Sequence, residues 1–356
     1  METTFDNSFA VLTQQQIGDG LNVVALVSTA DGSDLSVALS NSTDASLTVS
    51  QNTIGARANG NVAALNGTGD AVATGTFLRV DANTILSNDS GGAVNNGLDS
   101  LVTFDNGAAG APSFGFVAGS QQFITNDGGA GIAASSDGNS LSVTAAGLLN
   151  VGGAVYGSSI SVEDNTAFAL ASGNTGGTAI ELTATSITAS AGLASDQTIA
   201  NTNVDALLGD TSAFALSVLA EGDATSSSIL LDNNLSVAEA SGNIGRTLLS
   251  ADADTALLSN NTRDLAAGFI NIAGATPATR TIADFGLSAN QLITGSDLTA
   301  IARSALGATV GSTTGTANDA GAIGSSTISL SSNAQQATAS GNTLTNGIAL
   351  SGNVIG

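Results

Sequence analysis

The chain of 356 residues has no histidine, cysteine, lysine or tryptophan and contains one tyrosine and one methionine. Without histidine or cysteine it cannot build a Ser/His/Asp triad, a thiol nucleophile or the common zinc and haem sites. Without lysine it forms neither a Schiff base nor a Walker-type phosphate loop. Its chemistry is therefore limited to carboxylates, arginine, hydroxyl groups and the backbone.

Positive charge is also scarce, and the formal net charge is -23. The basic residues are all arginines, scattered along the chain: Arg57, Arg79, Arg246, Arg263, Arg280 and Arg303. Such a chain repels phosphates, so we expect no nucleic-acid partner. The hydrophobic fraction of 42% is too high for an intrinsically disordered acidic chain, and we expect a folded protein.

Long apolar runs are missing too, so we expect no insertion into a membrane. Residues 1–10 have neither the basic region nor the apolar block of a signal peptide. Export would then use a signal removed before this numbering starts, or a route without one. The absence of cysteine fits both exported and cytosolic proteins.

One sequence pattern occurs four times. It has apolar residues at offsets 0 and 2, Asn at offset 5, Ala at 9 and 11, and Gly-Asn at 13 and 14, and its copies begin at Leu47, Ile160, Ile229 and Ile328. A degenerate copy follows Leu78. The predicted structural turns of the full copies are Asn52, Gly60, Asn61, Asn165, Gly173, Asn174, Asn234, Gly242, Asn243, Asn333, Gly341 and Asn342.

Each offset has a physical interpretation. The first apolar pair is typical of a short strand with one buried face. The Asn at offset 5 tolerates left-handed backbone and is predicted to turn the chain. The Ala-x-Ala-x-Gly segment predicts a second strand with very small inward side chains, and Gly-Asn a second turn. Stacked copies would align their asparagines in a ladder of side-chain amides.

The spacing of partial copies suggests a period. Ile348, Leu350 and Asn353 repeat the first half of the pattern 20 residues after Ile328, Leu330 and Asn333. The sequence therefore predicts an all-β fold, a parallel β-helix or β-solenoid with coils of about 20 residues that stack about 4.8 Å apart. One or several β-sandwiches are the alternative fold, against which the small Ala-x-Ala-x-Gly strand argues.

Departures from the pattern divide the chain further. Residues 1–30 are predicted to be an N-terminal strand segment that is able to pair with another subunit, and residues 31–356 the solenoid with irregular insertions. A Phe-rich insertion with its own small core is expected near residues 100–125, around Phe104, Phe114, Phe116 and Phe123. Capping signals predict a short helix at 296–307 and a second at 204–220.

Acidic pairs are the remaining candidates for chemistry: Asp31 with Asp34, Asp252 with Asp254, and Glu163 with Asp164. Glycoside hydrolysis needs two carboxyl groups across a sugar, usually beside an aromatic platform that one tyrosine hardly supplies. We therefore expect that the protein is not an enzyme. Calcium is the other use of Asp31, Asp34, Asp252 and Asp254, but no EF-hand spacing is present, so we expect no required cofactor and leave loosely bound Ca²⁺ open.

The full repeat, Ile/Leu-x-Val/Leu-x-x-Asn-x-x-x-Ala-x-Ala-x-Gly-Asn, resembles the large β-strand-repeat surface proteins of marine and other Gram-negative bacteria, and among appendages it is similar to the tubular spinae. The resemblance implies secretion, an extracellular location at the cell surface, and a role in surface layers, adhesins or assembled appendages. We expect a structural subunit that self-assembles into an extracellular filament, tube or surface layer. A monomeric adhesin or binding module and a carbohydrate-active β-helix enzyme are the alternatives.

The predicted partner is another copy of the chain. Residues 346–356 carry no charge, no proline and no helix signal, which are the usual protections of a sheet edge. Strand-like segments near residues 9–27 are suited to adding to such an edge. The predicted subunit interface consists of Phe9, Val11, Val23, Leu26, Ile348, Leu350 and Asn353.

Overall fold

The computed structural model is all-β, and it contains no helix in the part of the chain that it describes. Nor does that part contain a helix long and apolar enough to cross a membrane. The described residues are 3–5, 9–18, 21–28, 35–40, 44, 46–63, 75–87, 102–103, 115–125, 131–137, 140–146, 155–209, 214–221, 224–258, 262–269, 278–283, 285–310 and 323–355.

The chain passes four times through the same series of sheets, and we call each pass a layer. Layer 1 contains β2 (Phe9–Ile17), β3 (Val23–Ser28), β4 (Leu35–Ser40), β5 (Ser46–Ser50), β6 (Thr53–Asn59), β7 (Val62–Ala63), β8 (Thr76–Asp81) and β9 (Thr84–Ser87). Layer 2 contains β11 (Phe116–Thr125), β12 (Ile132–Asp137), β13 (Ser140–Ala146), β14 (Val155–Tyr156), β15 (Ser159–Glu163) and β16 (Thr166–Ala189).

Layers 3 and 4 repeat this order. Layer 3 contains β17 (Ala191–Ala200), β18 (Val204–Leu208), β19 (Phe214–Glu221), β20 (Ala224–Thr225), β21 (Ser228–Asp232) and β22 (Leu235–Leu257). Layer 4 contains β25 (Phe285–Thr294), β26 (Leu298–Ala302), β27 (Ser304–Val310), β28 (Ile323–Gly324), β29 (Thr327–Ser331), β30 (Ala334–Ser351) and β31 (Val354–Ile355). The remaining strands are β1 (Thr4–Phe5), β10 (Val102–Thr103), β23 (Thr262–Phe269) and β24 (Ala278–Ala283).

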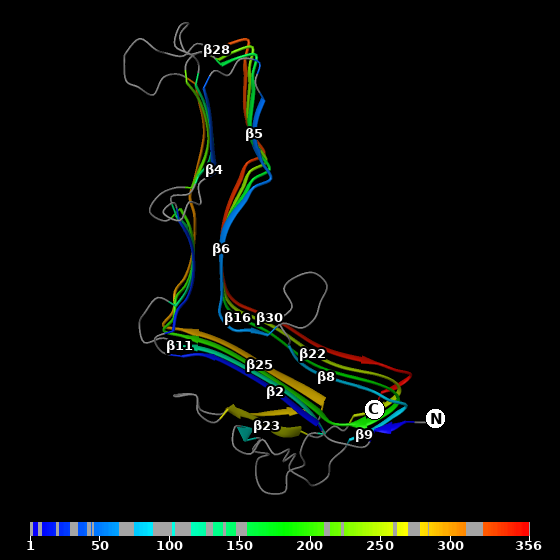
Figure 1. Ribbon diagram of the computed structural model, residues 1–356. Helices are drawn as coiled ribbons and strands as arrows, with labels where there is room; N and C mark the ends of the chain where they lie inside the picture. Colours follow the sequence, from blue (N-terminus) through cyan, green and yellow to red (C-terminus); the bar gives the residue numbers. More distant parts are fainter. Residues whose placement is uncertain are drawn as a thin grey trace.

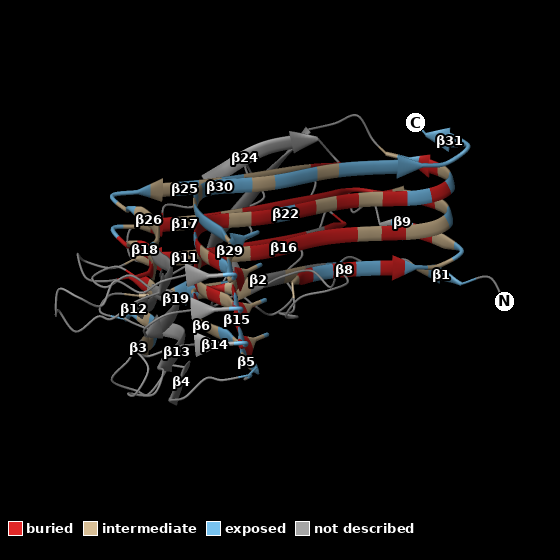
Figure 2. Cartoon of the chain, turned by 90° about the horizontal axis from the view of Figure 1, so that it is seen from above, coloured by how far each residue is buried: buried red, intermediate tan, exposed pale blue. Residues whose placement is uncertain are grey.

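Corresponding strands of successive layers pair in parallel, in orders such as β2-β11-β17-β25 and β5-β15-β21-β29. Figure 1 looks along the stack, where the layers nearly superimpose: β4 faces β5 along one arm, and the β11 stack faces β16 and β22 along the other. Figure 2 shows the layers side by side, with the middle two buried. Antiparallel pairing, which a sandwich requires, occurs among the described strands at β10–β23 and β23–β24.

The predicted 20-residue coil is wrong. Ile328 and Ile348, 20 residues apart, lie in β29 and β30 of the same layer, and their neighbours in layer 3 are Ile229 and Leu249. Residues that do stack, such as the offset 5 asparagines, are separated by 113, 69 and 99 residues. The short period was misleading because every strand of a layer alternates inward apolar residues, whichever sheet it joins.

Both predicted helices are also wrong. Residues 204–220 contain β18 and β19, and residues 296–307 contain β26 and the start of β27. Leu298, Ala300 and Ala302 pack on the core at every second position. The parallel partner strands of the neighbouring layer satisfy the backbone hydrogen bonds of these segments. This pairing outweighs the local helix-capping signal.

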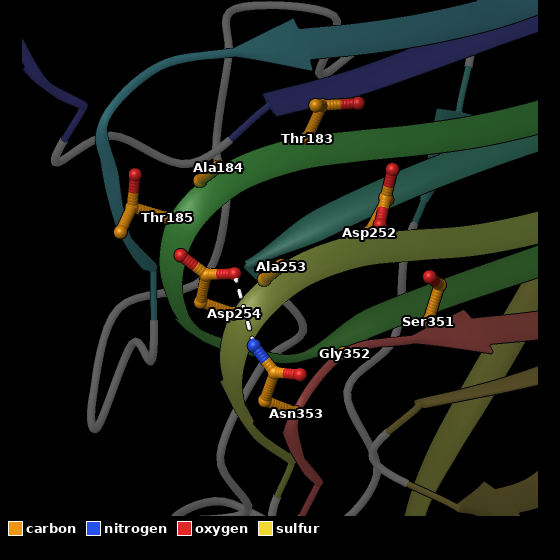
Figure 3. Close-up of a pocket in the computed structure, with 9 residues that line it drawn as sticks. All are labelled: Thr183, Ala184, Thr185, Asp252, Ala253, Asp254, Ser351, Gly352 and Asn353. Carbon is orange, nitrogen blue, oxygen red and sulfur yellow. Dashed lines mark hydrogen bonds between the residues drawn. The ribbon is translucent and has the colours of Figure 1, made fainter.

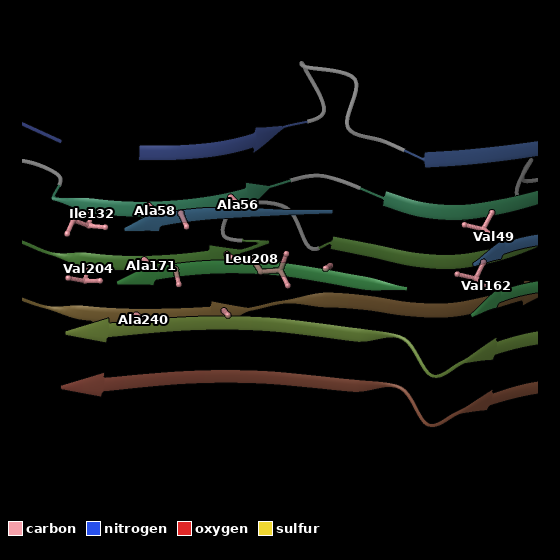
Figure 4. Close-up of a cluster of buried hydrophobic side chains, with 14 of the residues drawn as sticks. Val49, Ala56, Ala58, Ile132, Val162, Ala171, Val204, Leu208 and Ala240 are labelled. Atoms are coloured by element: carbon pink, nitrogen blue, oxygen red, sulfur yellow. The ribbon is translucent and has the colours of Figure 1, made fainter. Parts of the chain in front are cut away.

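The stack has two apolar cores. The first lies between sheets near β6 and β18 and contains small side chains such as Ala58, Ala171 and Ala240, with Ile132 and Val204 beside them (Figure 4). The second contains Ile180, Leu182 and Phe116. The predicted small inward residues are confirmed, since Ala169 and Ala238 are fully buried.

Described strands come from both the predicted N-terminal segment and the expected Phe-rich insertion. Within the N-terminal segment, β2 pairs with β11 and β3 with β12 of the same chain, and each lies at the outer edge of its sheet. In the expected Phe-rich insertion, Phe116 and Phe123 belong to β11, with Phe116 buried in the second core, so this part of the segment is a regular member of the stack. Phe104 and Phe114 lie outside the described residues.

Candidate assembly interface

The offset 5 asparagines form the predicted ladder. Asn52 Nδ2 donates to Asn165 Oδ1 (2.9 Å), Asn165 Nδ2 to Asn234 Oδ1 (2.9 Å) and Asn234 Nδ2 to Asn333 Oδ1 (2.8 Å). The second proton of each inner amide binds a backbone carbonyl of the previous layer, as Asn234 Nδ2 does with Val162 O (3.0 Å). Asn165 and Asn234 are fully buried. The ladder prediction is confirmed.

These asparagines are not themselves the left-handed residues of the corner. The positive φ falls one position earlier, at Gln51, Asp164, Asn233 and Ser332, with values from 51° to 58°. The left-handed residue turns the chain so that the next side chain points inward, where the asparagine amide joins the ladder. The corner therefore lies within one residue of its predicted position, and the left-handed residue is the one before the asparagine.

A second ladder joins the Gly-Asn positions. Asn61 Nδ2 donates to Asn174 Oδ1 (2.9 Å), Asn174 Nδ2 to Asn243 Oδ1 (2.8 Å) and Asn243 Nδ2 to Asn342 Oδ1 (2.8 Å). The same amides reach across to the opposite sheet, where Asn174 Nδ2 donates to Thr198 O (3.0 Å). In Figure 1 the stack bends between β6 and β8, where this ladder lies. It therefore joins the facing sheets at the bend.

A third ladder, made of glutamines, was not predicted from the sequence. Gln122 Nε2 donates to Gln15 Oε1 (2.7 Å), Gln197 Nε2 to Gln122 Oε1 (2.7 Å) and Gln291 Nε2 to Gln197 Oε1 (2.6 Å). The signal was present in the sequence as a Gln-x-Ile triplet that occurs once in each layer, at 15–17, 122–124, 197–199 and 291–293. Gly176 and Gly245 make room for it, because a Cβ there would lie 2.6 Å and 2.9 Å from the nearest glutamine oxygen.

Layer 4 exposes side chains whose equivalents in the inner layers are buried. Ile348 is 51% exposed, whereas Leu249 and Ile180 in the same column are 0% exposed. Leu330 is 50% exposed, whereas Leu231 beside it is 0% exposed. Figure 2 shows β30 exposed along most of its length beside the buried β22. We call the outer side of layer 4 the layer 4 face.

The other side of the stack is the layer 1 face, and it is less open: Leu78, in the column of Ile348, is 8% exposed, and β9 pairs with β1. Phe9 is 42% exposed, although Phe116 beside it in β11 is fully buried. The structure places the predicted interface residues Phe9, Val11, Val23 and Leu26 on the edge strands β2 and β3, and Ile348, Leu350 and Asn353 on or beside β30. The two groups therefore lie on opposite faces of the stack, and their role in an interface stays a prediction.

The charge distribution sets these faces apart. Strands β25 to β31 of layer 4 contain no charged residue, and those of layer 1 contain Arg57, Arg79 and Asp81. The strands of layers 2 and 3 hold many of the acids, namely Asp137, Glu163, Glu181, Asp196, Asp205, Glu221, Asp232, Glu239, Asp252 and Asp254. Sheet edges of monomers are usually protected by charge or proline, and the strands of the layer 4 face have neither.

The acidic candidates that the structure describes lie at two separate places, Glu163 and Asp164 at the end of β15 and Asp252 and Asp254 in β22. Asp252 and Asp254 line a shallow hollow with hydroxyl and amide side chains from three layers (Figure 3), and Asn353 Nδ2 donates to Asp254 Oδ1 (3.3 Å). Asp31 and Asp34 lie outside the described residues. Among the residues that the structure describes, no group of three potential metal ligands is present. Asp164 Oδ1 accepts a hydrogen bond from Asn233 (2.6 Å).

Comparison with known proteins returned no similarity: no family model, no curated protein and no solved structure matches the chain.

Proposed function

We propose that the chain is a β-solenoid with large coils and that it is the structural subunit of a self-assembling extracellular filament, tube or surface layer. The observation that carries this proposal is the pair of open faces. Among the described strands, both faces have edges with no partner beyond them, apart from β9, whose outer edge pairs with β1. Ile348, Leu330 and Phe9 are exposed at positions that a further layer would cover. A second copy of the chain supplies strands of the matching length, order and direction.

Burial and charge both support this partner. Covering Ile348, Leu350 and Leu330 removes large apolar surface from water, which stabilises an interface by roughly 25 cal/mol per Å². A net charge of -23 opposes association, but the acids of layers 2 and 3 stay away from the contact. The layer 4 face, whose strands contain no charged residue, is the place where two acidic copies approach each other with least repulsion.

The extracellular location and the kinship with β-strand-repeat surface proteins, including the spinae-like appendages, belong to the same proposal. They are supported by the four repeat copies. No specific observation favours a catalytic role: Asp252 and Asp254 line an open hollow whose lining contains no aromatic and no basic side chain. A monomeric adhesin would leave both faces open, which is the costlier arrangement for an edge without protecting charges.

The experiment compares two substitutions on one strand. Ile348→Lys places a charge in the inward column of Leu249, and Ala349→Lys places it in the outward column of Ser250 and Glu181. Negative-stain microscopy of the wild-type chain and the outward variant should show regular polymers, and the inward variant should show none. A wild-type chain that stays monomeric at every concentration and salt condition would refute the proposal.

A further inference from the structure

We infer that assembly is head to tail and in register: the layer 4 face of one copy binds the layer 1 face of the next, so that the three amide ladders continue through the junction. This inference rests on the proposed self-assembly and adds which two faces meet and what aligns them. It follows from the direction of the ladders and from one column of glycines.

Both asparagine ladders donate in the same direction, from layer 1 toward layer 4. At the layer 4 end, Asn333 Nδ2 donates to Leu231 O and Asn342 Nδ2 to Gln291 O, so each amide has one proton without a partner among the described residues. At the layer 1 end, no described group donates to Asn52 Oδ1 or Asn61 Oδ1. The two ends are complementary as donor and acceptor.

The glutamine ladder runs the opposite way. Each glutamine donates to the one in the layer below, which leaves the second proton of Gln15 Nε2 without a described partner at the layer 1 end, beside its bond to Val62 O (2.9 Å). At the layer 4 end, no described group donates to Gln291 Oε1. A head-to-tail junction therefore forms two Asn–Asn bonds in one direction and a Gln–Gln bond in the other.

Pairing of identical faces lacks this complementarity. If two layer 4 faces met, the donors of Asn333 and Asn342 would face donors, and Gln291 Oε1 would face an acceptor. The strands would also run antiparallel, whereas the layers of the chain are parallel throughout the stack. Because a buried polar group without a partner costs about 1–3 kcal/mol, the ladders favour the head-to-tail arrangement.

A column of glycines, one in each layer, tests whether two copies stack in this register. A Cβ added at Gly60, Gly173 or Gly242 would lie 2.7 Å, 2.8 Å and 2.9 Å from the carbonyl oxygen of the glycine in the next layer. At Gly341, the fourth member, an added Cβ has nothing within 4 Å. In the proposed junction it would meet the carbonyl of Gly60 in the next copy. Gly341→Ala is therefore harmless to the single chain and obstructive to the in-register junction.

The first test blocks one face at a time and measures size by analytical ultracentrifugation. Ile348→Lys blocks layer 4, and Phe9→Lys blocks layer 1; both side chains are half exposed, so each variant should fold, as circular dichroism will check. Head-to-tail assembly predicts that each variant alone is monomeric and that an equal mixture forms dimers with one copy of each. Val24→Lys, at an outward and exposed position of β3, is the control that should still polymerise.

The outcomes separate this inference from the proposed function. If either blocked variant forms dimers alone, its free face pairs with itself, and the head-to-tail inference is overturned while self-assembly stands. The same holds if both variants still polymerise, because contacts along the sides would then suffice. A monomeric wild-type chain would instead overturn the proposed function.

The second test needs only one added methyl group. Gly341→Ala should raise the critical concentration for polymerisation at least about tenfold, with an unchanged denaturation midpoint of the monomer. Gly347→Ala on the same strand, where an added Cβ comes no closer than 3.5 Å to its neighbours, should leave the critical concentration unchanged. Equal critical concentrations for the two variants would contradict the in-register junction.

Discussion

Ile348 in β30 lies in register beside Leu249 in β22, yet Ile348 is 51% exposed and Leu249 is 0% exposed. The two side chains occupy the same place in successive layers. What differs is that Leu249 has a layer on each side and Ile348 has a described layer on one side only. The difference shows how much of an inward side chain a neighbouring layer buries, and it makes the layer 4 face a candidate interface.

The asparagine ladder should contribute strongly to stability. Asn234→Leu removes the bonds to Val162 O and Asn333 Oδ1 and takes away the acceptor of Asn165 Nδ2. We expect the free energy of unfolding, measured by urea denaturation of dilute protein, to fall by about 1–3 kcal/mol. Asn290→Leu, at an exposed position of β25, is the matched control. Equal losses in both variants would mean that the ladder is not specifically stabilising.

The first core, which is lined by buried alanines, should not accommodate larger side chains. Ala169 is fully buried between facing sheets, so Ala169→Leu forces its neighbours apart and should lower the free energy of unfolding by about 1–3 kcal/mol or more. Thermal melts followed by circular dichroism would measure it. Ala349→Leu on the exposed outward side of β30 should have little effect. A neutral Ala169→Leu variant would show that the core has room that the structure does not predict.

The glutamine ladder should matter as much as the asparagine ladders, although its residues were not singled out from the sequence. Gln197→Leu leaves Gln122 Oε1 and Ile244 O without the donor Gln197 Nε2, and it removes one of the two acceptors of Gln291 Nε2. We expect the denaturation midpoint to fall to an extent that corresponds to about 1–3 kcal/mol. A midpoint equal to that of the wild-type chain would show that water replaces the lost partners.

Polymers should depend on salt. The acids of layers 2 and 3 repel one another across stacked copies, and screening acts within about 8 Å at physiological ionic strength. Light scattering should therefore show polymers dissolving at low ionic strength and recovering when sodium chloride is added. Calcium tested at the same ionic strength shows whether divalent ions act specifically. Polymers that are indifferent to salt would contradict the repulsion argument.

The repeat pattern was enough to predict an all-β stack, the asparagine ladder and the small core residues, because each depends on the residue type at a fixed offset. Asn165 and Ala169 show this directly. The size of a layer was not predictable from spacing. Ile328 and Ile348 repeat the same local pattern on two strands of one layer, and nothing in the residues distinguishes neighbours along a layer from neighbours across it.

Two further differences have identifiable causes. The segment at 296–307 carries good capping residues, but its every-second-residue apolar pattern from Leu298 to Ala302 fits the parallel sheet, and tertiary pairing prevails. The left-handed corner at Asp164, one residue before Asn165, was assigned to the asparagine because asparagine favours that conformation. The asparagine amide points inward to join the ladder, and the preceding residue adopts the left-handed conformation.

The most direct test of the central claim is X-ray fibre diffraction from aligned polymers of the 356-residue chain. If copies continue the stack, strands lie across the polymer axis, with a reflection at about 4.8 Å along the axis and a subunit repeat of about 19 Å for four layers. A 4.8 Å reflection perpendicular to the axis, or an axial repeat unrelated to four layers, would contradict stacking of layer 4 on layer 1.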